Sequence, residues 1–180
     1  MTTEINDVLL IGYGNPGRLD DGLGPALAEA VEKMNLPGVT VEADYQLTVE
    51  DAAEAARHRA VIFADVAVSG RAPFFFRRLA AGGATSFSSH ILEPQNVLAL
   101  AAEMFGAEVE GFALGIRGYE FNEFGERLSA GARENLAQAV SFLAEVLRKR
   151  DFRQAAALNG TNDDEKVLGD GESKCETANM

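Results

Sequence analysis

A glycine-rich turn between an apolar strand and a helix is the feature that most constrains the fold of this chain. Residues 8–11 form a short, continuous apolar run, and a helical pattern follows the turn from residue 26 to residue 34. Such a run, ended by Gly12, is typical of a strand buried on both faces of a sheet. The turn also contains two adjacent carboxylates, Asp20 and Asp21. Because carboxylates repel a phosphate group and attract a cation, the turn indicates a cation-binding site.

Strand-like and helix-like segments alternate along most of the chain, which favours a mostly parallel sheet covered by helices on both faces. The link at residues 69–71 is too short for a parallel crossover, so the strand that follows it is expected to be antiparallel. The other expected strands lie at residues 39–44, 60–66, 72–79 and 109–116, and the other helices at residues 48–57, 94–105 and 128–150.

Length and composition bound the domain organisation. Residues 1–150 are expected to form a single α/β domain. The periodic pattern dissolves from residue 151, and residues 159–180 are rich in Gly, Asn, Asp and Glu, so a disordered acidic tail is expected over residues 151–180. The single cysteine, Cys175, excludes disulfides and cysteine-based zinc sites within the chain.

Charge and hydropathy restrict the partners. The formal net charge of −12 disfavours binding to nucleic acid or to an anionic membrane. No apolar run reaches the ~18 residues that cross a bilayer, and the first residues lack the pattern of a signal peptide. A cytoplasmic protein is therefore expected.

Several candidate ligands for a metal ion follow the expected strands. Asp44 and Asp65 end two of them, and His90 lies four residues before the helix that begins at Pro94. Because the carboxyl ends of parallel strands meet at one edge of a sheet, these residues are expected to gather there with Asp20 and Asp21. An imidazole with two or three carboxylates suits a divalent transition metal. Aspartates at strand ends also cap turns, and a lone histidine is often a core residue, so the pattern leaves both interpretations open.

Other polar and aromatic residues carry weaker signals. His58, between two arginines at a helix end, is expected to be exposed to solvent. Tyr119, Phe121 and Phe124 are expected either to line a cleft or to serve in packing.

The spacing of Gly12, Gly14 and Gly17 also matches the dinucleotide-binding fingerprint. In that motif the helix begins near the third glycine, but here residues 18–22 intervene. They place carboxylates where a pyrophosphate requires free N–H groups. Nucleotide binding is therefore the weaker alternative.

Three blocks of the sequence together resemble the [NiFe]-hydrogenase maturation endopeptidases. The blocks are GYGNP at residues 12–16 with DDGLGP at 20–25, IFAD at 62–65, and SH at 89–90 ahead of a leucine-rich helix. The similarity runs from about residue 8 to residue 148. It implies a three-layer α/β/α fold with a twisted, mostly parallel five-stranded sheet and one antiparallel strand. It also implies that Asp21, Asp65 and His90 bind a metal ion.

The resemblance implies a hydrolase, an aspartic-type endopeptidase by family, that removes the C-terminal extension of a [NiFe]-hydrogenase large-subunit precursor. The nickel would arrive with the precursor, cadmium or zinc substituting for it in vitro, and no organic cofactor is expected. Either the metal or a carboxylate such as Asp44 or Asp20 would activate water. An alternative is a non-catalytic factor that recognises the nickel-loaded precursor without cutting it. No nucleic acid or membrane partner is expected.

Overall fold

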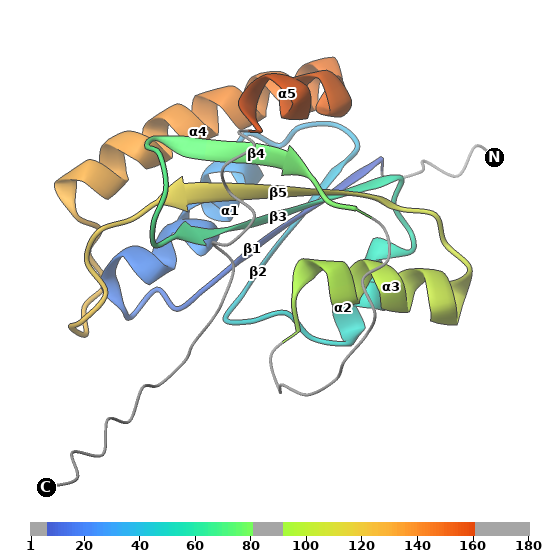
Figure 1. Cartoon of the computed structure of the whole chain (residues 1–180), viewed down its shortest axis with the longest axis horizontal. Coiled ribbons are helices and arrows are strands. Elements are labelled where there is room, and N and C mark those ends of the chain that lie inside the picture. The colour runs from blue at the N-terminus through green and yellow to red at the C-terminus, as the bar shows by residue number, and fades with distance from the viewer. Residues whose placement is uncertain (1–6, 81–91, 161–180) are drawn as a thin grey trace, which may run out of the picture.

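The computed structural model describes residues 7–80 and 92–160 and has three layers, with helices on both faces of a five-stranded sheet (Figure 1). Its strands are β1 (Val8–Tyr13), β2 (Val39–Asp44), β3 (Ala60–Ala67), β4 (Phe74–Arg78) and β5 (Glu110–Arg117). Their order in the sheet is β2-β1-β3-β5-β4. β1 is parallel to β2 and β3, β3 is parallel to β5, and β4 is antiparallel to β5. The expected three-layer class and the single antiparallel strand are therefore confirmed.

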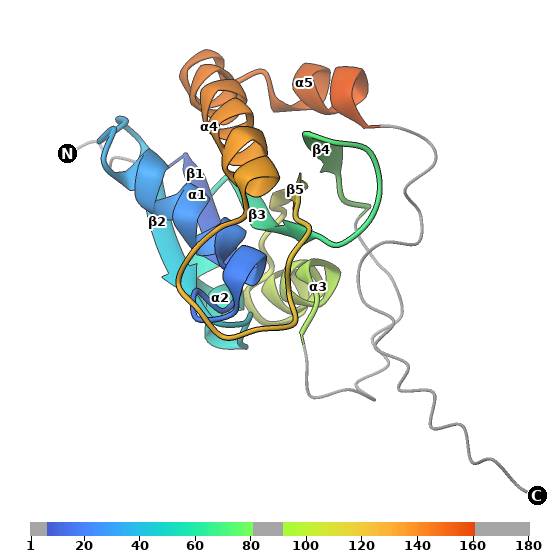
Figure 2. The same ribbon diagram turned by 90° about the vertical axis from the view of Figure 1, so that its left-hand side faces the viewer.

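Helices pack on both faces of the sheet. They are α1 (Leu23–Glu32), α2 (Glu50–Ala55), α3 (Pro94–Phe105), α4 (Ala130–Lys149) and α5 (Phe152–Asn159), with a 3-10 helix η1 (Leu19–Gly22) before α1. α1 and α4 cover one face, and α2 and α3 cover the other (Figure 2). Among the described residues, no helix combines the length and the apolar character that a membrane crossing requires.

The strands separate two apolar cores because successive side chains point to opposite faces of the sheet. Val8 and Leu10 of β1 are buried with residues of α1 and α4. Leu9 and Ile11 are buried with residues of α2 and α3. β1 therefore has the continuous apolar sequence that a central strand of such a sheet requires.

Two glycines allow α1 to lie close to the backbone of β1 and β3. A Cβ on Gly24 would lie 2.6 Å from the carbonyl oxygen of Ala64 and closer still to that of Tyr13. A Cβ on Gly12 would meet the carbonyl of Gly24 in the same way. Part of the glycine-rich pattern thus serves helix–sheet packing.

The expectation that regular structure ends at residue 150 is wrong for residues 152–159, which form α5. The Phe152 ring lies 5.6 Å from that of Phe112, and Arg153 donates two hydrogen bonds of 2.8 Å to Glu110. α5 packs over β4 and β5 and completes that side of the core (Figure 1). Its apolar pattern is too short to predict this packing from the sequence. The rest of the expected tail, residues 161–180, lies outside the described residues.

The expectation that His58 is exposed is also wrong. Its side chain is buried, with Nδ1 2.9 Å from the Glu54 carbonyl oxygen and Nε2 3.0 Å from the Thr40 hydroxyl. His58 thereby ties the end of α2 to β2. Its arginine neighbours in the sequence, Arg57 and Arg59, are the exposed residues.

Candidate active site

The ends of three parallel strands bring the expected carboxylates to one rim of the sheet. Tyr13 of β1 is in register with Asp44 of β2. Gly12 is in register with Ala64 of β3, so the next residue, Asp65, lies beside Tyr13. The 3-10 helix with Asp21 follows β1 at the same edge. The strand ends and the turn after β1 thus place Asp21, Asp44 and Asp65 along the same edge of the sheet, as parallel topology predicts.

Asp21 and Asp65 form the electrostatic centre of this rim. Both side chains are partly buried. Burial and the negative charge of nearby Asp21 raise the pKa of Asp65 to about 7, although the Val66 N–H donates a 2.7 Å hydrogen bond to its Oδ1. The Asn15 N–H donates to Asp21 Oδ2 at 3.0 Å. Two carboxylates that repel each other would both be stabilised in their charged forms by a cation between them.

Tyr13 is a site residue that the sequence reasoning missed. Its burial, the charge of Asp65 and a hydrogen bond to the Asp65 side chain raise the pKa of the Tyr13 hydroxyl. Tyr13 therefore stays protonated beside Asp65. The sequence contained a signal for this neighbour, because Tyr13 and Asp65 end two strands that lie side by side in parallel, with both side chains on the same face of the sheet.

Asp20 is a structural anchor, and its surroundings exclude it as a group that activates water. The side chain is fully buried, and its carboxylate accepts four hydrogen bonds. Burial alone would raise the pKa of Asp20, but these bonds outweigh burial and lower it. The donors are the N–H groups of Tyr119, Glu120 and Ser129 and the Ser129 hydroxyl, at 2.7 to 2.9 Å.

The remaining expected site residues differ in what the structure describes. Asp44 is exposed, and its Oδ1 accepts a 2.8 Å hydrogen bond from the Tyr45 N–H. Its action on water stays a prediction. His90 lies outside the described residues. The charge of Glu93, at the start of α3, contributes to raising the pKa of Tyr13, after burial and Asp65. Within residues 7–80 and 92–160, no three His, Cys, Asp or Glu side chains are grouped to hold a metal ion.

The N–H groups of the glycine-rich turn are already used within the protein. Asn15 N–H binds Asp21, Gly17 N–H binds the Asn15 side chain, and Gly14 N–H binds the Asp44 carbonyl. The N–H groups of residues 18–21 donate to backbone carbonyls. A pyrophosphate needs such donors free, so the hydrogen bonding disfavours the dinucleotide interpretation.

No protein-family model matches the chain, and no curated protein sequence matches it. The fold is nevertheless similar to several solved structures. A [NiFe] hydrogenase maturation protease HycI from Thermococcus kodakarensis KOD1 aligns with a TM-score of 0.62 and 22% identity over 79% of this chain and 93% of that chain. The hydrogenase 2 maturation peptidase from Thaumarchaeota archaeon SCGC_AB-539-E09 aligns with a TM-score of 0.60 and 23% identity, over 79% of this chain and 98% of that chain.

A third similar structure comes from a bacterium. The hydrogenase maturating endopeptidase HybD from E. coli aligns with a TM-score of 0.58 and 20% identity, over 82% of this chain and 95% of that chain. The alignments span nearly the full length of all three proteins. The chain therefore has the fold of the [NiFe]-hydrogenase maturation proteases.

Proposed function

We propose that this protein is an endopeptidase that removes the C-terminal extension from a nickel-loaded [NiFe]-hydrogenase large-subunit precursor. The observation that carries the proposal is the pair Asp21 and Asp65 at the rim of a fold shared with maturation proteases. The three sequence blocks that resemble this family include both aspartates and His90.

In this proposal Asp21, Asp65 and His90 bind the nickel that the precursor carries. The negative charge of Asp21 and the burial of Asp65 make a second negative charge on Asp65 unfavourable, which is why the pKa of Asp65 is raised to about 7. A divalent ion offsets that repulsion and displaces the proton from Asp65. Precursor without nickel lacks this attraction, so the protease would act only after nickel has been inserted.

Hydrolysis adds water across the peptide C–N bond, and the chain offers two ways to promote it. The precursor's metal would polarise the peptide carbonyl or position the water. Alternatively, the exposed carboxylate of Asp44 would take a proton from the water. Tyr13, which lies beside Asp65 on the adjacent strand, keeps its hydroxyl protonated in both cases.

The proposal includes a cytoplasmic location and no organic cofactor. The single cysteine is consistent with a compartment where structural disulfides are rare. Cadmium or zinc is expected to bind the same three side chains in vitro, because both accept mixed nitrogen and oxygen ligands.

The intact mass of a nickel-loaded precursor, before and after incubation with this protein, tests the proposal. A mass loss equal to the C-terminal peptide is expected, and none with nickel-free precursor. Asp65→Asn and His90→Ala should abolish the loss, whereas Glu145→Gln, on the exposed side of α4, should not. Normal processing by Asp65→Asn would refute the site. Stable association with the loaded precursor without mass loss would instead support a non-catalytic recognition factor.

A further inference from the structure

The loop between β5 and α4, residues 118–129, is bound tightly to the turn that carries Asp21. The Leu19 N–H donates to the Gly125 carbonyl at 2.9 Å, and the Gly125 N–H donates to the Gly17 carbonyl at 2.8 Å. Asp20 binds both ends of the loop through four further hydrogen bonds. The loop and the Asp21 turn therefore form one rigid unit, although about a hundred residues separate them in the sequence.

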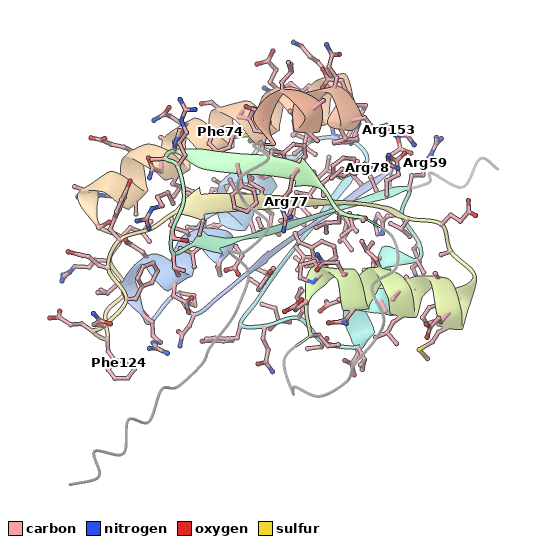
Figure 3. All side chains as sticks on the ribbon, in the orientation of Figure 1. Arg59, Phe74, Arg77, Arg78, Phe124 and Arg153 are labelled. Atoms are coloured by element: carbon pink, nitrogen blue, oxygen red, sulfur yellow. The ribbon has the colours of Figure 1, made fainter. Side chains whose placement is uncertain are left out.

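This rigid loop presents a phenylalanine to solvent. Phe124 is 89% exposed, the highest value among the exposed large hydrophobic residues that the structure describes. Its side chain points away from the body of the protein (Figure 3). Its neighbour Phe121 packs against the apolar core, so the loop has a buried and an exposed aromatic residue. Aromatic residues held in this way are typical anchors of protein–protein interfaces.

The loop that carries the exposed ring is rich in acidic residues. Glu120, Glu123 and Glu126 of the loop are exposed. The one basic side chain of the loop, Arg127, lies 3.6 Å from Glu123 and is paired with it. Asp21 adds negative charge on the adjoining turn. A partner that fits this surface has an apolar pocket edged by lysine or arginine side chains.

We infer that Phe124 is the docking anchor for the precursor, and this inference rests on the proposed function. The ring inserts into an apolar pocket edged by basic residues on the folded part of the precursor. Because hydrogen bonds fix the loop to the Asp21 turn, docking places the precursor's nickel next to Asp21 and Asp65. The anchor thus sets affinity for the precursor, and the carboxylates act on the metal.

Steady-state cleavage of the nickel-loaded precursor by Phe124→Ala tests the inference. Loss of a hot-spot aromatic is expected to raise KM about tenfold or more, with kcat within about twofold of the wild type. Phe105→Ala is the matched control, since Phe105 is 50% exposed at the far end of α3, away from the carboxylate rim. Its KM should not change. Thermal unfolding should show Phe124→Ala as stable as the wild type, because its ring is exposed, and Phe105→Ala folded but slightly less stable, because that ring is half covered.

A charge reversal tests the basic edge of the partner. Glu126→Lys should raise KM by about threefold to tenfold at low ionic strength, and the difference should shrink as salt is added. An unchanged KM would refute the basic edge.

The outcomes separate the docking inference from the proposed function. Cleavage by Phe124→Ala with wild-type KM would refute the docking role and leave the protease intact. A lower kcat with unchanged KM would also refute it, because the ring would then act on the geometry of the site. If the wild type neither cuts nor binds the precursors of its host, the proposed function fails and the docking inference falls with it.

Discussion

Ser129 binds both carboxylate oxygens of Asp20. Its N–H donates to Oδ1 and its hydroxyl donates to Oδ2, each at 2.7 Å, across 109 residues of sequence. The same hydroxyl accepts a hydrogen bond from the Ala132 N–H and so caps α4. Through this pair, the turn next to the candidate site is joined to the start of the longest helix that the structure describes.

Asp20→Ala is expected to destabilise the protein by about 3 kcal/mol or more, because it leaves buried N–H groups without an acceptor. Ser129→Ala should cost about 1 to 2 kcal/mol, since it removes one bond to Asp20 and the helix cap. Urea unfolding measures both. An Asp20→Ala midpoint equal to that of the wild type would contradict the anchoring role.

Asp65→Asn is expected to stabilise the metal-free protein increasingly as pH rises. The pKa of Asp65 is about 7 when folded, above its ordinary value near 4, so the folded state binds the proton more tightly. The wild-type protein therefore loses up to about 4 kcal/mol of its free energy of unfolding as pH rises from about 4 to 7, and Asp65→Asn does not. Melting temperatures of both proteins at pH 5 and pH 8 check this. A Tm difference that does not grow with pH would contradict it.

Asp21→Asn and Asp44→Asn should separate metal recognition from the action on water. Asp21→Asn removes charge at the centre of the rim, so both precursor binding and cleavage should fall, cleavage by about a hundredfold or more. Asp44→Asn should lower kcat and leave binding of the nickel-loaded precursor unchanged. Binding and single-turnover cleavage measure the two effects. Full activity of Asp44→Asn would assign water activation to the metal.

Gly24→Ala should be far more damaging than Gly17→Ala. A Cβ at Gly24 would collide with the backbone of β1 and β3, which cannot yield locally, so a cost of about 3 kcal/mol or more is expected. A Cβ at Gly17 lies 3.2 Å from the Asn15 side chain, which can shift. Urea unfolding of both variants tests this difference. Equal costs would contradict the packing role given to Gly24.

Phe152→Ala tests whether α5 belongs to the domain. Loss of the ring that packs on Phe112 should cost about 2 to 3 kcal/mol. Arg153→Ala, which removes the exposed ion pair with Glu110, should cost about 1 kcal/mol or less. Chemical denaturation of each variant gives these values. Negligible loss in Phe152→Ala would mean that α5 contributes little to folding.

Much of the fold could be predicted because its signals are local. Residues 39–44 alternate in polarity, and Pro94 marks a helix start, so β2 and the beginning of α3 were expected correctly. The meeting of Asp44 and Asp65 at one rim followed from parallel topology alone. His58 and α5 could not be predicted, because their burial depends on distant partners, Thr40 and the β4–β5 edge.

The sequence by itself determined that two adjacent carboxylates follow the first strand and that they lie at the rim of a parallel sheet. The resemblance to the maturation endopeptidases singled out Asp21, but only the tertiary structure shows the physical difference between the two side chains. In the sequence Asp20 and Asp21 are chemically equal. Folding brings Ser129 and its neighbours to Asp20, where they occupy its oxygens, while Asp21 accepts one bond from Asn15. A hydrogen bond forms only when donor and acceptor come within about 3 Å, and that distance belongs to the folded chain.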